Sequence, residues 1–156
     1  WWPGMAYQLA LLQGDPAAVS DPGLVAAAER GRHIKAVELI GAALTRAELH
    51  HRMARFFASY DLLLTPTLPL AAFEVAHLLP PAGAWGEDWT GWAPFSYPFN
   101  LTQQPAASLP CGFTREGLPV GLQVVGAIGR DDLVLRASRA FETCHPFVMP
   151  ETPRSI

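Results

Sequence analysis

The side chains that could act as nucleophiles in this chain are hydroxyls, and none stands in a setting typical of a catalytic serine. Serine hydrolases need a nucleophile, a group that takes its proton, and donors for the developing oxyanion. No serine lies in a Gly-x-Ser-x-Gly motif, and the chain contains neither Ser-Ser nor Gly-Gly. The one lysine, Lys35, opens a predicted amphipathic helix, where solvated lysines are typical. We therefore predict no catalytic residue within this chain.

Histidine and cysteine are the residue types that would bind a metal, and their spacing argues against a metal site. His50 and His51 are adjacent on a predicted helix, so they point to different faces and miss the i,i+4 spacing of a helical metal pair. Cys111 and Cys144 are isolated and are expected to be small buried residues and not reactive thiols. No phosphate-binding glycine motif occurs. We predict no metal and no cofactor.

Composition excludes several classes of protein. Half of the 156 residues are hydrophobic and 16% are charged, which is typical of a chain that buries a core. The net charge of −3, without a basic run, predicts no direct contact with nucleic acid. No uninterrupted apolar run reaches the ~18 residues of a membrane span. We expect a soluble, cytoplasmic protein, and because residue 1 is Trp, we expect this chain to come from a longer one.

Residues 1–60 are predicted to be helical. A first helix over 3–12 ends before Gly14, and a second begins after Asp21 as its N-cap and ends at Gly31 as a left-handed cap. Apolar residues at three-and-four spacing over 35–60 predict one long amphipathic helix. Within it, Glu48 and Arg52 stand at the favourable i,i+4 spacing of an ion pair.

Residues 61–126 are predicted to contribute strands. The short apolar run 61–66 is typical of a strand buried on both faces of a mostly parallel sheet. Residues 106–113 and 120–125 flank a turn over 114–117 and predict a hairpin. Pro110 and Pro119 must then lie at strand ends, edges or bulges. A final helix over 131–145 is expected to begin with Asp131 as its N-cap.

Between these elements, residues 68–100 show no period and are rich in tryptophan, proline and glycine. Long loops of this kind in compact domains are commonly functional. Lining a pocket and contacting another chain are equally good explanations for the tryptophans, because exposed aromatic side chains usually mark one or the other.

Three sequence blocks, in this order and spacing, resemble the C-terminal part of the amidase signature family. They are YDLLLTPTLP at 60–69, FNLTQQPAASLPCG at 99–112 and GLPVGLQVVG at 117–126, and the resemblance runs from about Gly23 to Phe141. This family comprises serine amidases and includes the A subunit of the glutamyl-tRNA(Gln) amidotransferase. The resemblance implies an α/β fold, with a mixed sheet flanked by helices, of which residues 1–156 form a single partial domain.

The same resemblance implies hydrolysis of amide carbon–nitrogen bonds by a serine that a second serine and a lysine activate. In the family those groups precede the region matched here, so the chain is expected to lack them and to be inactive alone. The segment before the asparagine borders the acyl site in the family. It follows from the resemblance that Trp92, Phe95 and Asn100 are the candidate substrate-binding residues.

Two positions depart from the family pattern. Glycine usually stands where this chain has Gln103, so a turn with positive φ would be strained here. The glutamine-using amidotransferases share an acidic residue several positions before the asparagine, and the corresponding place lies near Ala93 in an apolar run. This departure favours a plain amidase with an apolar acyl pocket over a glutamine-dependent enzyme.

The sequence thus predicts the C-terminal segment of an amidase, which meets a small amide substrate through its missing N-terminal part. A protein similar to the glutamyl-tRNA(Gln) amidotransferase, or a non-catalytic binding module that uses the aromatic loop, is the alternative. Strand edges left open in such a segment would favour a homo-oligomer.

Overall fold

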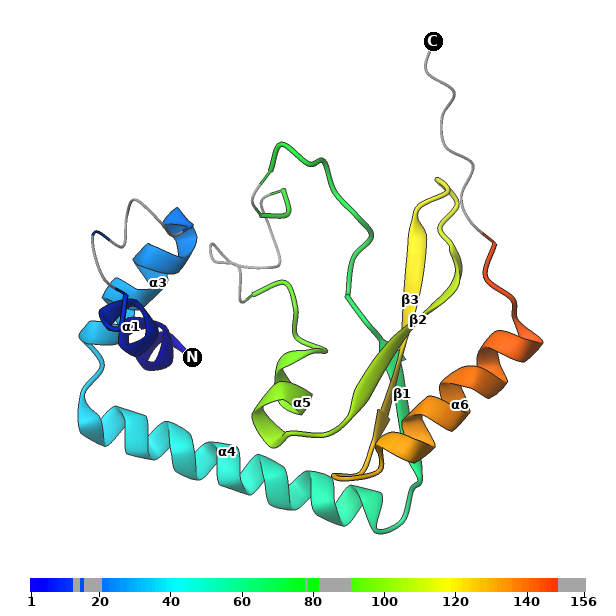
Figure 1. Cartoon of the computed structure of the whole chain (residues 1–156), viewed down its shortest axis with the longest axis horizontal. Coiled ribbons are helices and arrows are strands. Elements are labelled where there is room, and N and C mark those ends of the chain that lie inside the picture. Colours follow the sequence, from blue (N-terminus) through cyan, green and yellow to red (C-terminus); the bar gives the residue numbers. More distant parts are fainter. Residues whose placement is uncertain (13–14, 16–20, 78, 82–90, 149–156) are drawn as a thin grey trace. The chain divides into compact units, whose positions relative to one another are not determined.

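The computed structural model describes residues 1–12, 15, 21–77, 79–81 and 91–148 (Figure 1). The chain divides into two compact units, Trp1–Ala47 and Glu48–Ile156. The long helix α4, Ala36–Phe57, runs through the boundary between them. Each unit is therefore described by itself.

The first unit contains helices α1, Trp2–Ala10, and α3, Pro22–Arg32. Asp21 caps α3 as predicted, because its Oδ1 accepts hydrogen bonds from the backbone N–H groups of Gly23 at 2.7 Å and Leu24 at 3.2 Å. Gly14 lies outside the described residues.

The prediction that Gly31 ends α3 as a left-handed cap is wrong. The helix continues to Arg32, and the cap residue His33 is right-handed, with φ −89°. A Cβ on Gly31 would lie 2.1 Å from the carbonyl oxygen of Trp2. Glycine is needed here because α1 packs closely against α3 and leaves no room for a side chain.

Helix α4 confirms the long helix predicted over 35–60, together with the ion pair between Glu48 and Arg52. No residue of α4 is buried in the structure. Its apolar positions Val37, Ile40 and Leu44 are 71%, 61% and 68% exposed.

The second unit is built on a three-stranded sheet of β1, Leu62–Pro66, β2, Ala106–Phe113, and β3, Pro119–Gly126, in the order β1-β3-β2. The hairpin of β2 and β3 is confirmed, and its turn places Gly117 at φ 81°. Pro119 opens β3, and Pro110 borders a bulge in β2. Both prolines thus lie where a missing N–H is tolerated.

The parallel pairing predicted for residues 61–66 is wrong in this chain. β1 pairs antiparallel with β3, in the register Leu62 to Gly126 and Pro66 to Leu122. Its leucines are not buried on both faces either, because Leu62 and Leu63 are only half-buried and Leu64 is 58% exposed. A continuous apolar run identifies a strand but does not identify its partner, which here is the last strand of a later hairpin.

Alternation of side chains gives this sheet two different faces. One face, here called the α6 face, carries Leu122 and Val124 of β3 with Leu109 of β2. The opposite face, here called the α5 face, carries Gly121 and Gln123 of β3. The helices α5, Tyr97–Thr102, and α6, Asp131–Cys144, lie on opposite sides of the strands (Figure 1).

One hydrophobic core cluster of this unit lies between the α6 face and α6. Val134 of α6 is 3% exposed and clusters with Leu109 and Val124, and half-buried Phe141 packs against the cluster. Gly126 also lies close to α6, because a Cβ there would come within 2.8 Å of the Cγ2 atom of Val134.

Two predicted boundaries need correction. Asp131 is the first helical residue of α6, and the cap position is Arg130, which makes no side-chain cap hydrogen bond. Asp131 instead stabilises the first turn through the helix dipole. Helix α5 overlaps the end of the range 68–100, which is predicted to be a loop. The sequence does not reveal this helix, because its six residues are too few to show a helical period. No helix among the described ranges is long and apolar enough to cross a membrane.

Candidate functional site

A cavity of about 700 Å³ lies on the α5 face, beside the segment that follows β1. Its walls are mainly apolar and aromatic, and none of the described residues that line it is charged. Residues that follow β1 form one wall, the strands of the hairpin form another, and a tryptophan and a phenylalanine from elsewhere in the unit contribute rings. The lining residues include Thr67, Phe73, Trp92, Ser108, Gly121 and Phe147. A cavity of this size and lining suits an uncharged, largely apolar group.

Two hydroxyls give this cavity its polar corner. The Oγ1 atom of Thr67 and the Oγ atom of Ser108 lie 2.7 Å apart and share a hydrogen bond, although the residues are 41 positions apart in the sequence. The backbone N–H of Thr67 donates to the carbonyl of Gly121 at 2.9 Å, which extends the β1–β3 pairing and holds Thr67 in line. The central strand thus fixes both hydroxyls on one face.

Trp92 contributes an aromatic wall. Its ring meets Phe73 edge to face, with centroids 5.7 Å apart and an interplanar angle of 88°. Such a pair contributes roughly 0.5–1.5 kcal/mol beyond area burial. The indole Nε1–H is buried and has no acceptor among the described residues. A buried donor without a partner is costly, so this ring is held by packing and not by hydrogen bonding.

The structure places the three candidate substrate-binding residues differently. Trp92 lines the cavity, whereas Phe95 and Asn100 do not. Phe95 is half-buried, and its carbonyl accepts a hydrogen bond from Nε2 of Gln123 at 3.0 Å. Asn100 is exposed on α5. A substrate-contacting role stays a prediction for all three.

Gln123 connects the sheet to the segment that carries these residues. It is 6% exposed, and its Nε2 atom also donates to Oγ1 of Thr65 at 2.8 Å. The amide therefore ties β3 to β1 and to the chain just before α5. A polar side chain in the middle of the sheet serves here to position the loop beside the cavity.

The turn after α5 has a positive φ at Gln103, the position where the family usually has glycine. Gln103 adopts φ 64° and ψ 31°, the left-handed conformation, and its N–H donates to the carbonyl of Phe99. Glycine takes this conformation without steric cost, whereas a residue with a Cβ is disfavoured by roughly 1–2 kcal/mol. Gln103 therefore carries local strain at the corner that leads into β2.

Comparison with known proteins identifies the family. The family model described as Amidase matches residues 24–135. The chain belongs to the amidase family. An acylamidase from Rhodococcus erythropolis is 32% identical over 94% of this chain and 31% of its own length. The A subunit of the glutamyl-tRNA(Gln) amidotransferase from Brevibacillus brevis is 42% identical over 55% of this chain and 17% of its own length.

Solved structures give the same result for the fold. A bacterial aryl acylamidase of the amidase signature family matches with a TM-score of 0.73 and 29% identity, over 93% of this chain and 32% of that one. The α/β amidase signature fold predicted from the sequence is thus confirmed. The chain spans about a third of the length of the acylamidases it matches.

Two of the described serines of this amidase segment, Ser108 and Ser138, make side-chain hydrogen bonds. Oγ of Ser138 donates to the carbonyl of Val134, and Ser108 is paired with Thr67, which is not a base. Groups of three or more His, Cys, Asp or Glu residues that could hold a metal do not occur in the part of the chain that the structure describes. The prediction that Cys111 and Cys144 are buried is wrong, because both are exposed.

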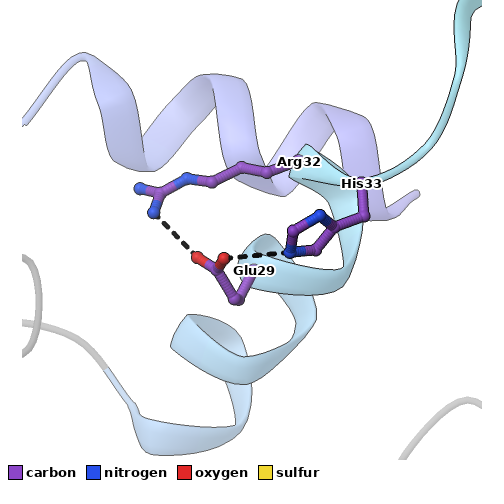
Figure 2. A network of polar contacts seen from close by, with 3 residues as sticks. All are labelled: Glu29, Arg32 and His33. Atoms are coloured by element: carbon purple, nitrogen blue, oxygen red, sulfur yellow. Dashed lines mark hydrogen bonds and ion pairs between the residues drawn. The ribbon is translucent and has the colours of Figure 1, made fainter.

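The first unit carries a cluster of polar side chains that are not among the residues lining the cavity. Glu29 of α3 contacts Nη1 of Arg32 at 2.8 Å and Nε2 of His33 at 3.3 Å (Figure 2). All three side chains are more than half exposed. Exposed pairs of this kind contribute roughly 0.2–1 kcal/mol at most. These ion pairs therefore add little to the stability of the C-terminal end of α3.

Sequence reasoning missed Thr67, Ser108 and Phe73 as lining residues. Thr67 stands in the first block of the family resemblance, and Ser108 stands in the second. The pairing of β1 and β2 around β3 brings them together. No local pattern in the sequence indicates that order.

Proposed function

We propose that this chain is the C-terminal part of an amidase and supplies a wall of the acyl pocket in an enzyme that hydrolyses uncharged amides. The observation that carries the proposal is a cavity of about 700 Å³, with no charge among the described residues that line it, in a chain of the amidase family. An apolar cavity binds an acyl group by removing its surface from water.

In this proposal the chemistry is performed by groups outside the chain. The family resemblance implies a serine activated by a second serine and a lysine, and none of the described serines has such partners. The contribution of this chain is binding and orientation, which hold the amide near the attacking group and exclude water. Trp92 would form the aromatic wall, while Phe95 and Asn100, which do not line the cavity, stay predicted substrate contacts of the segment before and within α5.

A chimera tests the proposal. The segment of the Rhodococcus erythropolis acylamidase that matches this chain would be replaced by residues 1–156. Hydrolysis of p-nitroacetanilide, which releases the coloured p-nitroaniline, would be followed by absorbance. We expect turnover by the chimera, and a loss of about tenfold or more in kcat/KM on Trp92→Ala.

Two controls keep this test decisive. Trp1→Ala provides a matched tryptophan change at an exposed position in the first unit and is expected to leave turnover unchanged. A well-folded chimera that hydrolyses no amide, although the parent acylamidase does, would overturn the proposal. Equal activity of the Trp92→Ala variant and the unaltered chimera would remove Trp92 from the pocket.

A second candidate is favoured by the 42% identity with the amidotransferase from Brevibacillus brevis. In that case the chain would act with partner proteins and use glutamine. None of the described residues that line the cavity carries a charge that could pair with the α-amino or α-carboxylate group of glutamine. Release of ammonia from glutamine by a chimera with the Brevibacillus brevis protein, without hydrolysis of the anilide, would favour this candidate.

The predictions about the aromatic loop, the cellular location and the oligomeric state stay predictions. Trp85 and Trp89, which the binding-module alternative uses together with Trp92, lie outside the described residues. A cytoplasmic location and a homo-oligomer formed through open strand edges are likewise our proposals, which fractionation and light scattering would test.

A further inference from the structure

The hydroxyl pair of Thr67 and Ser108 has hydrogen-bonding capacity that the protein does not use. Each hydroxyl has one hydrogen and two lone pairs. Their mutual bond uses one hydrogen and one lone pair. Among the described residues, neither hydroxyl makes another hydrogen bond. One hydrogen and three lone pairs therefore stay available beside a cavity whose walls are otherwise mainly apolar. The third lining hydroxyl, that of Thr114, accepts hydrogen bonds from the backbone N–H groups of Glu116 and Leu118.

The absence of a side chain at Gly121 makes room for this pair. A Cβ at Gly121 would lie 2.7 Å from Oγ1 of Thr67 and 3.0 Å from Oγ of Ser108. Both distances are shorter than ordinary van der Waals contact. A larger residue on the central strand would displace the two hydroxyls, so glycine at this position preserves their arrangement.

The rest of the lining determines what these hydroxyls can recognise. The described residues that line the cavity include no lysine, arginine or carboxylate, so they offer no opposite charge to a charged ligand group that loses its hydration. Phe73 and Trp92 offer aromatic surface on another wall. A flat, uncharged group with one polar atom matches both parts of the cavity.

We propose that Thr67 and Ser108 form a hydrogen-bonding anchor that selects uncharged aromatic groups carrying one hydroxyl or carbonyl oxygen. This inference deepens the proposed function, on which it rests for the name of the bound group, because it specifies the kind of acyl group that the cavity accepts. Gly121 is a positioning residue in this arrangement. The anchor acts in binding and not in bond cleavage.

Binding of two probes of matched shape tests the anchor. 4-Fluorophenol and 4-fluorotoluene differ only in a hydroxyl in place of a methyl group, and ¹⁹F NMR titration of the full 156-residue chain gives a Kd for each. The Thr67→Val, Ser108→Ala double variant should shift the ratio of the two Kd values about tenfold towards 4-fluorotoluene, the size of one lost hydrogen bond. Gly121→Ala should shift it in the same direction.

Matched variants separate the hydroxyls from packing. Thr67→Ser and Ser108→Thr keep both hydroxyls and should keep the wild-type ratio. Thr143→Val, a change of the same type on the exposed side of α6, should also keep it. If the double variant does not fold, Ser108→Ala alone, at an exposed strand position, is expected to give the same direction of shift.

Three results would overturn the inference: no binding of 4-fluorophenol to the chain, an unchanged Kd ratio in the valine and alanine variants, or an equal shift in Thr67→Ser. The assay needs no hydrolysis. An inactive chimera with a hydroxyl-dependent ratio would therefore remove the proposed function alone, whereas an active chimera with an unchanged ratio would remove only the anchor.

Discussion

The two faces of the three-stranded sheet share one backbone and use it for different purposes. On the α6 face, Leu109 and Val124 are 6% and 3% exposed and pack against Val134. On the α5 face, Gln123 hydrogen-bonds to the loop, and Thr67 and Ser108 border a cavity. Because successive side chains of a strand point to opposite sides, each strand contributes to both. Different side chains of the same strands therefore pack against α6 and line the cavity.

The same contrast appears in the glycines of β3. Gly126 lies against Val134 in the core, and Gly121 lies against the two hydroxyls at the cavity. Both keep space clear, but one clears it for a helix and the other for a hydrogen-bonding pair. The role of a small residue depends on what approaches it from outside the strand.

The largest expected effect is on the α6 face. Leu109→Ala should lower the free energy of unfolding by about 2–5 kcal/mol, because it leaves a cavity beside Val134. Leu135→Ala, which changes a leucine of α6 that is 67% exposed, should cost less than about 0.5 kcal/mol. Chemical denaturation measures both. Similar costs for the two variants would refute the assignment of the core.

The next effect compares the two glycines directly. Gly126→Ala should destabilise the chain by about 1–3 kcal/mol, because the new methyl group overlaps Val134 in a packed core. Gly121→Ala should cost less, since the displaced hydroxyls adjoin open space. Thermal unfolding ranks the two variants. The comparison between the faces fails if Gly121→Ala is the more destabilising change.

A stabilising change is expected at the corner between α5 and β2. Gln103→Gly should raise the free energy of unfolding by about 0.5–1 kcal/mol, because glycine relieves the left-handed strain at φ 64°. Gln103→Asn should give a smaller gain, as asparagine tolerates this conformation better than most residues. Urea unfolding would detect both. An equal gain from Gln103→Ala would show that strain is not the cause.

The smallest effect concerns an exposed charge pair at the start of α6. A hydrogen bond from Arg130 at 3.0 Å, assisted by its charge, lowers the pKa of the Asp132 carboxyl below its ordinary value. Because the folded pKa is depressed, the pair stabilises the fold above the unfolded pKa. That contribution is lost as the pH falls through the folded value.

Arg130→Gln should therefore raise the pKa of Asp132 towards its ordinary value, which a ¹³C NMR titration of the carboxyl would follow. Arg115→Gln, in the hairpin turn, provides the control and should leave that pKa unchanged. An Asp132 pKa that does not respond to Arg130→Gln would contradict the pairing. Cavity binding should be unaffected by either variant, because neither arginine lines the cavity.

Local signals in the sequence determined much of the secondary structure. Asp21 and Pro22 predicted the start of α3, three-and-four spacing predicted α4, and a short turn with Gly117 predicted the hairpin. These features depend on residues within a few positions of one another, so a single sequence contains them. The family resemblance likewise depends on three continuous stretches of sequence, which can be compared without a structure, and the match to the family confirms it.

Tertiary structure decided the rest. The antiparallel partner of β1, the helical surroundings of Gly31 and the meeting of Thr67 with Ser108 each depend on segments that are distant in the sequence. Trp92 lines the cavity, whereas Phe95 and Asn100 do not. The hydrogen bond from Gln123 to the carbonyl of Phe95, between residues 28 positions apart, holds this segment on its path. Side-chain type determined which residues could pack or hydrogen-bond. The order of the strands determined which of them met.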